Sequence, residues 1–222
     1  MKFLFITLFF IQLSATDYID YLHPYHPTST KGGMVVSQNA LSSELGIKIL
    51  DMGGNAVDAA VAVGFSLATT LPRAGNIGGG GFMLIYIKDK DELFYIDYRS
   101  KSPKNSSIQK LLGVKEIPDR DSDLWERVDY SYLASGVPGT VYGLLEAHTN
   151  FGKLDLKQIM EPVIEQAENG IMVTSDLNYV IQVTPQLKNN KESLSIYFNN
   201  GDPLEEFSIF KRPDLANTFR EI

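Results

Sequence analysis

The sequence predicts an α+β fold in which a β-hairpin is packed between layers of helix or against another sheet. Two apolar, aromatic and β-branched runs, FMLIYI at 82–87 and LFYIDY at 93–98, have the composition of strands but do not alternate cleanly. Near-continuous apolar strands are typical of sheets buried on both faces. Before them, residues 57–71 are mostly Ala, Val, Leu and Phe, which predicts a helix that is buried all round.

The composition is that of a globular protein and argues against several classes of partner. The 222 residues are 44% hydrophobic and 21% charged, which predicts one domain with a substantial core. A formal net charge of −7 without any basic run argues against nucleic acid or an anionic membrane surface as a partner, and favours a small ligand. Because cysteine is absent, disulfides, thiolate metal sites and a cysteine nucleophile are excluded.

The N-terminus has the pattern of a cleavable signal peptide over residues 1–15. Lys2 precedes the apolar stretch 3–13, and small residues precede the polar Thr16. The apolar stretch is too short to span a bilayer, and the alternatives are a buried strand or a membrane anchor. Residues 16–32 form a polar lead-in, in which His23 and His26 are either a metal half-site or part of a solvated tail.

The chain becomes regular from Gly33. MVVSQ at 34–38 is expected to be a short strand, and Asn39 is expected to cap the helix that follows. Gly53 and Gly54 would end this helix. Its apolar residues recur at helical spacing: Leu41, Leu45, Ile49 and Met52.

The apolar helix at 57–71 has its own start and stop signals. Asn55 is a plausible cap, Asp58 lies in the first turn where the helix dipole favours a carboxylate, and Pro72 stops the helix. Four consecutive glycines follow at 78–81. Because glycine is costly to order, such a run indicates backbone packed closely against other atoms.

An arginine, Arg99, directly follows the second strand run in IDYRSKSP. The runs are connected by the charged KDKDE at 88–92, which predicts a hairpin. An arginine that emerges from a buried strand can bind a carboxylate or phosphate through two parallel N–H groups. The alternative for Arg99 is a surface ion pair.

The second half is expected to be helix and loop. Residues 100–131, including Trp125, have little periodicity and are predicted to be loop. Pro138 suits the first position of a helix that ends near Gly152. His148 in this helix is interpreted as a surface residue rather than a general base, since the sequence shows no neighbouring carboxylate or serine pattern.

A further helix is predicted from Asp155 to Asn169. Pro162 is expected to kink or split it, and Gly170 to close it. More helix and loop are expected from there to Ile222.

The common catalytic and nucleotide-binding motifs are missing. The glycine run lacks the Lys-Ser/Thr of a P-loop and the spacing of a dinucleotide-binding turn. The sequence also contains no G-x-S-x-G elbow and no H-E-x-x-H motif. From the residues alone, the chain is a secreted domain with a glycine loop and an arginine.

Four blocks, in order, resemble the large subunit of the gamma-glutamyltransferases, also called glutathione hydrolases. They are GGNAVDAAVAVGFSLATTLPRAGNIGGGGFMLIYI, IDYRSKSP, LASGVPGTVYGLLEAH and EPVIEQAENGIMV. The resemblance starts near Gly33 and continues to the end of the chain, so residues 33–222 look like the N-terminal portion of that subunit. It implies an N-terminal nucleophile hydrolase fold, an αββα sandwich, here incomplete.

The resemblance also implies a role for Arg99 and a set of partners. Arg99 matches the family arginine that binds the α-carboxylate of the γ-glutamyl substrate. The resemblance also implies that the glycine run at 78–81 has a structural role and does not bind a ligand. The implied partners are glutathione and other γ-glutamyl compounds, and a small subunit that carries the catalytic threonine. The family chemistry needs neither metal nor cofactor.

This chain departs from the family pattern in two ways. Ser100 stands where the family usually has an acidic residue after the arginine, which puts the geometry of carboxylate binding in question. The segment that starts with the nucleophilic threonine is missing, as is the glycine pair of the oxyanion hole, and Thr69-Thr70 lies inside the apolar helix.

Two functional hypotheses follow from these departures. In the first, the chain is part of a γ-glutamyltransferase and glutathione hydrolase that is secreted or periplasmic after signal cleavage. In the second, it is an inactive product that acts as a ligand-binding or subunit-interaction module. Alone, it is expected to leave sheet edges and an apolar face uncovered.

Overall fold

The computed structural model describes residues 29–119, 122–129 and 132–222. The predicted signal peptide (1–15) and most of the lead-in, with His23 and His26, lie outside the described residues. From Gly33 to Ile222 the chain forms one compact unit. No helix in the described ranges is both long enough and apolar enough to cross a membrane.

The first two helices begin where their capping residues predict. In α1 (Ala40–Asp51), the Asn39 side chain accepts hydrogen bonds from the N–H groups of residues 41 and 42. In α2 (Ala56–Thr70), the Asn55 side chain accepts from the N–H groups of residues 57 and 58, and Asp58 accepts from the Asn55 N–H in return. Gly53, with φ of 92°, lies just beyond α1 and confirms the predicted end.

The strand predicted at 34–38 is wrong. These residues have no strand assignment, and Val36 is 83% exposed. The reason is that no neighbouring strand in the described residues pairs with them. A β-branched run can form a ladder only where a partner edge is available.

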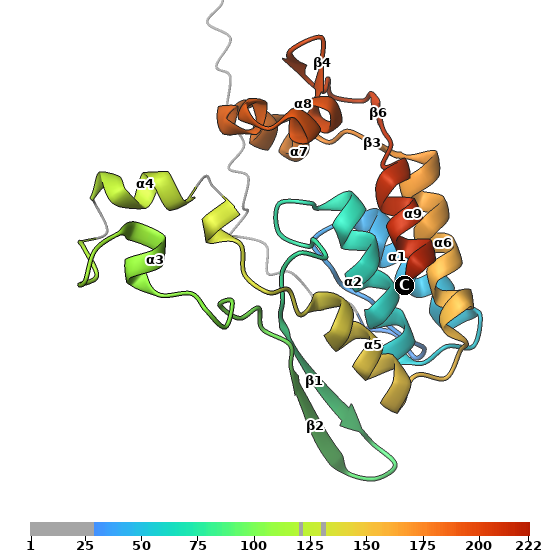
Figure 1. The fold of residues 1–222 in the computed structure, drawn as a ribbon. Helices are drawn as coiled ribbons and strands as arrows, with labels where there is room; N and C mark the ends of the chain where they lie inside the picture. The colour runs from blue at the N-terminus through green and yellow to red at the C-terminus, as the bar shows by residue number, and fades with distance from the viewer. Residues whose placement is uncertain (1–28, 120–121, 130–131) are drawn as a thin grey trace, which may run out of the picture. The chain divides into compact units, whose positions relative to one another are not determined.

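Helix α2 is the centre of the main core. It packs against α1, α5 (Thr140–Phe151) and α6 (Leu156–Asn169), and α9 (Pro213–Glu221) packs on α6 (Figure 1). Phe65 of α2 is fully buried and meets Phe219 of α9 edge to face, with ring centroids 5.9 Å apart. Helix α6 continues through Pro162 without being split, and Gly170 follows its end at φ of 89°.

The predicted hairpin forms, but within this chain it is buried on one face only. Strands β1 (Phe82–Ile87) and β2 (Glu92–Asp97) pair antiparallel, with Leu84 opposite Tyr95. One row of side chains packs against the helical core: Met83, Ile85, Ile87, Phe94 and Ile96. The alternate row is 58–67% exposed: Phe82, Leu84, Tyr86, Leu93 and Tyr95. The prediction of burial on both faces is therefore wrong here, because no described element covers this outer row.

Residues 100–131 contain helices where loop was predicted. Helices α3 (Ile108–Leu112) and α4 (Asp123–Asp129) precede the short 3₁₀ helix η1 (Tyr132–Ala134). Ser107 caps α3 by accepting from the Lys110 N–H at 3.3 Å, and Gly113, at φ of 74°, ends it. Both cap residues were readable in the sequence, but the helix is too short to show periodicity.

The part of the chain between α6 and α9 has a small core of its own. It comprises β3 (Ile171–Met172), α7 (Ser175–Gln182), η2 (Pro185–Asn189), α8 (Lys191–Tyr197), β4 (Phe198–Asn199), β5 (Asp202–Pro203) and β6 (Ile209–Phe210). The short strands pair as β3 with β6 and β4 with β5. Apolar side chains from these elements form the core: Ile171, Val173, Leu177, Ile181, Phe198 and Phe210. Helix and loop were predicted here, whereas the strand pairs were not.

Candidate functional site

Arg99 lies two residues beyond the end of β2 and is exposed. Its backbone N–H donates to the Asp97 carboxylate at 2.9 Å, which leaves the guanidinium out of that contact. Within the described ranges no carboxylate is at ion-pair distance from this guanidinium. The surface ion pair considered as the alternative is therefore not formed with any described carboxylate, and within those ranges the five N–H donors remain available for a ligand.

The backbone on both sides of Arg99 is held by hydrogen bonds. Before it, the Tyr98 N–H donates to the Gly81 carbonyl at 3.1 Å, and the Gly81 N–H donates to the Tyr98 carbonyl at 3.3 Å. After it, Lys101 and Val137 exchange two bonds of 3.1 and 2.8 Å. Arg99 therefore lies in an extended segment that is paired to the glycine run on one side and to the entrance of α5 on the other.

The glycine run makes room for this segment. A Cβ atom at position 80 would lie 2.5 Å from the Tyr98 carbonyl oxygen and would overlap the Ser100 amide nitrogen. A Cβ atom at Gly79, in contrast, would meet nothing closer than 3.7 Å. The prediction that the run admits close backbone is confirmed at position 80.

Helix α5 starts two residues later than predicted, next to a contact between residue 139 and the glycine run. Pro138 was expected at its first position, but the helix begins at Thr140, with Gly139 as the flanking residue. The Gly139 N–H donates to the Gly79 carbonyl at 2.8 Å, and a Cβ atom on Gly139 would overlap the Tyr98 carbonyl oxygen. The tertiary contact between the glycine run and residue 139 therefore fixes the start of the helix.

A pocket of about 650 Å³ with a mixed polar and apolar lining adjoins the Arg99 segment. Its lining includes hydroxyl, ammonium and aromatic groups from residues 100–136, among them Ser100, Lys101, Ser102, Lys110 and Tyr132. Ser100, the residue that departs from the family pattern, thus lies at the wall of a hollow. A serine there can donate or accept a hydrogen bond, but it brings no charge.

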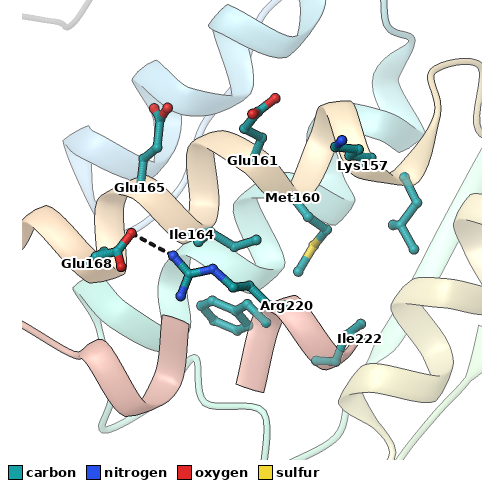
Figure 2. A pocket seen from close by; sticks show the side chains of 10 residues that line it. Lys157, Met160, Glu161, Ile164, Glu165, Glu168, Arg220 and Ile222 are labelled. Carbon is teal, nitrogen blue, oxygen red and sulfur yellow. Dashed lines mark hydrogen bonds and ion pairs between the residues drawn. The ribbon is translucent and has the colours of Figure 1, made fainter. Parts of the chain in front are cut away.

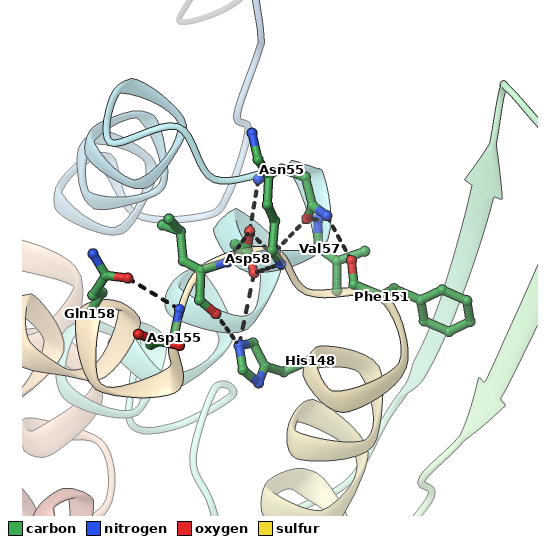
Figure 3. A network of polar contacts seen from close by, with 9 residues as sticks. Asn55, Val57, Asp58, His148, Phe151, Asp155 and Gln158 are labelled. Atoms are coloured by element: carbon green, nitrogen blue, oxygen red, sulfur yellow. Dashed lines mark hydrogen bonds and ion pairs between the residues drawn. The ribbon is translucent and has the colours of Figure 1, made fainter.

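A buried polar network joins α2 to the turn between α5 and α6 (Figure 3). The Asp58 carboxylate is fully buried and accepts from the N–H groups of Asn55 at 2.8 Å, Lys153 at 3.0 Å and Leu154 at 3.3 Å. The His148 Nε2 lies 2.8 Å from the Leu154 carbonyl oxygen and 4.0 Å from Asp58 Oδ1.

This network corrects the interpretation of His148. Its side chain is only 15% exposed and faces a carboxylate, so it is not a surface residue. Sequence reasoning missed the pair because the two residues lie in different helices and are distant along the chain. The Asp58 carboxylate is fully buried, and its hydrogen bonds connect the ends of these helices.

Two further features do not contribute to a reactive site. Thr69 and Thr70 are buried in the last turn of α2, where Thr70 Oγ1 lies 2.8 Å from Ser42 Oγ, so neither can act as a nucleophile. A surface groove of about 550 Å³ between α6 and α9 has an apolar floor and an exposed ion pair at its rim, Arg220 to Glu168 at 2.6 Å (Figure 2). Within the described ranges no group of three or more His, Asp or Glu side chains could hold a metal ion.

Comparisons with known proteins agree with the resemblance. A family model described as Gamma-glutamyltranspeptidase matches residues 42–222. The glutathione hydrolase proenzyme of Escherichia coli (strain K12) is 38% identical over 203 residues, which cover 89% of this chain and 33% of the relative. The capsule biosynthesis protein CapD proenzyme of Bacillus anthracis is 35% identical over 189 residues, covering 85% of this chain and 31% of the relative.

A solved structure also matches. The Helicobacter pylori gamma-glutamyltranspeptidase superimposes with a TM-score of 0.80 at 34% identity, over 89% of this chain and 55% of that chain. This likeness confirms the predicted fold class. The chain spans about a third of the length of the curated relatives that it matches.

Proposed function

The chain belongs to the gamma-glutamyltranspeptidase family, and we propose that it forms part of an enzyme that cleaves the γ-glutamyl bond of glutathione. The glutamyl group would pass to water, an amino acid or a peptide. The observation that carries the proposal is Arg99, which emerges from a clamped segment with its guanidinium unpaired in the described part of the chain.

Arg99 would bind the α-carboxylate of the γ-glutamyl group. A guanidinium matches a carboxylate with two parallel N–H donors, and the pair is stronger than a neutral hydrogen bond. Because hydrogen bonds hold the backbone on both sides of Arg99, the guanidinium would be preorganised to bind the carboxylate. This grip would fix the γ-carbonyl carbon relative to the attacking group.

The nucleophile would be a threonine outside this chain, carried by a small subunit. Its hydroxyl oxygen would bond to the γ-carbonyl carbon while the amide C–N bond breaks and the leaving amine takes the hydroxyl proton. Water or an acceptor amine would then attack the ester carbon, the ester C–O bond would break, and a proton of the attacking group would pass to the threonine oxygen. No residue of this chain is assigned a covalent step.

The outer row of the hairpin supports a partner of this kind. Five large side chains lie exposed on one face of β1 and β2: Phe82, Leu84, Tyr86, Leu93 and Tyr95. A contiguous exposed face of five large apolar and aromatic side chains is typical of an interaction surface. We propose that the small subunit covers it, which would complete the sandwich.

Export follows from the first 15 residues. Their pattern of one basic residue, an apolar stretch and small residues supports a signal peptide and a secreted or periplasmic location. N-terminal sequencing of the native protein would test this, since a chain that keeps Met1 would contradict it.

The function is tested by γ-glutamyl-anilide hydrolysis and intact mass on the protein from its native source. The expected result is turnover by a large chain paired with a smaller chain that starts with threonine. Arg99→Ala should raise KM strongly, and Arg99→Lys should rescue it only in part, because an ammonium cannot form the two parallel bonds. Arg220→Ala is the matched control, since its ion pair with Glu168 is exposed and joins α9 to α6.

A protein without turnover would support the second hypothesis, in which the chain is catalytically inactive. A single chain with no turnover, or an Arg99→Ala variant with an unchanged KM, would contradict the proposed function. The exposed hairpin row would then favour a subunit-interaction module.

A further inference from the structure

We infer that Tyr98 is a positioning residue whose ring, seated between Gly81 and Gly143, sets the direction of Arg99. The inference rests on the proposed role of Arg99 in binding a γ-glutamyl carboxylate. It adds a second residue to that site, one that would act only through the arginine.

The ring of Tyr98 occupies a slot formed by two glycines from distant segments. A Cβ atom on Gly81 would lie 2.9 Å from Tyr98 Cε2 and 3.1 Å from its hydroxyl oxygen. A Cβ atom on Gly143, in α5, would overlap Tyr98 Cγ and Cδ1 at the other end of the ring. No other residue type at 81 or 143 would leave the ring where it is.

Gly143 is unexpected in the interior of a helix. Glycine there costs about 1 kcal/mol relative to alanine. Its backbone is helical and not left-handed, so conformational freedom is not the reason for it. The close approach of the Tyr98 ring is the reason, and Gly139, one turn earlier, gives the Tyr98 carbonyl oxygen the same room.

The slot matters because, among the residues that the structure describes, the Arg99 side chain forms no hydrogen bond or ion pair that would orient it. Its direction is therefore set by the backbone of residues 98–101. The hydrogen bonds to Gly81 and Val137 hold this backbone at two points, and the half-buried ring, packed against Gly81 and Gly143, stops the segment from rotating about them. The Tyr98 hydroxyl forms no hydrogen bond to any residue that the structure describes, so the packing of the ring carries the effect.

The test is steady-state kinetics of γ-glutamyl-anilide hydrolysis by the complete enzyme that contains this chain. Because a misdirected guanidinium would lose charged hydrogen bonds to the carboxylate, we expect Tyr98→Ala to raise KM by about 10- to 100-fold, with a smaller change in kcat. Tyr98→Phe should restore KM, because the ring remains. Tyr179→Ala, at a tyrosine that is 62% exposed on α7, is the matched control.

A double-mutant cycle separates positioning from general stability. If Tyr98 acts through Arg99, Tyr98→Ala should have little further effect on KM in the Arg99→Ala background. Equal effects in both backgrounds, or an unchanged KM in Tyr98→Ala, would overturn the inference while leaving the function of Arg99 intact. An inactive wild type, or an Arg99→Ala variant with unchanged KM, would refute the proposed function and this inference with it.

A second pair of variants covers the case in which Tyr98→Ala does not fold. Gly81→Ala pushes the ring without removing apolar surface, whereas Gly79→Ala in the same loop meets only ordinary contacts. We expect KM to rise in Gly81→Ala and to stay close to wild type in Gly79→Ala. Equal KM values for the two variants would contradict the role of the slot.

Discussion

Replacing Asp58 by alanine is expected to lower the free energy of unfolding by about 3 kcal/mol. The fully buried carboxylate accepts hydrogen bonds from the N–H groups of Asn55, Lys153 and Leu154 (Figure 3). Leaving a buried donor unpaired costs about 1–3 kcal/mol, and these bonds are only part-buried, so each is taken at about 1 kcal/mol. The three hydrogen bonds together therefore contribute about 3 kcal/mol. They connect the start of α2 to the turn between α5 and α6.

Asp58→Asn separates charge from shape. One amide oxygen can keep part of the bonding, but the NH₂ group would face the Lys153 N–H, a donor against a donor. We therefore expect a loss of about 2 kcal/mol, between wild type and Asp58→Ala.

The assay is urea unfolding of each variant, with the midpoint compared at equal m-value. Asp89→Asn in the exposed hairpin turn is the matched control and should change stability by less than about 0.5 kcal/mol. If Asp58→Ala lost no more than this control, the carboxylate would not fasten the two segments and the reasoning would be refuted.

Three further outcomes are expected. Phe65→Ala, at a fully buried ring that meets Phe219, should cost about 3–5 kcal/mol in urea unfolding, and a loss below about 1 kcal/mol would contradict the packing of α9. Leu84→Lys, at a side chain 67% exposed, should leave chain stability nearly unchanged but weaken association with the small subunit in size-exclusion chromatography; unchanged association would argue against that interface. Burial raises the pKa of Tyr98 above 10.0, so the folded state holds this proton more tightly than the unfolded state. Its contribution to stability is present below the unfolded pKa and is lost as pH rises through the folded pKa, so stability should fall above about pH 10, and less steeply in Tyr98→Phe.

Much of the local structure could be predicted from the sequence because its signals are local. Asn39 and Asn55 cap helices through bonds to N–H groups two and three residues away, and such bonds need no tertiary contact. The hairpin follows from two β-forming runs and a charged turn, and Arg99 follows from its place after the second run. The helices at 108–112 and 123–129 were missed because they are too short for periodicity to emerge.

The sequence by itself determined the helical caps, the hairpin, the glycine run and the position of Arg99. The tertiary structure alone decided what those residues meet: Asp58 accepts from an N–H group 95 residues away, and Tyr98 fits between glycines of a loop and of a distant helix. It also decided that no described element covers the outer row of the hairpin, although its apolar pattern predicted burial. The physical reason is that pattern and propensity report what a residue can bury or bind, whereas only the packed chain determines which partner lies within reach.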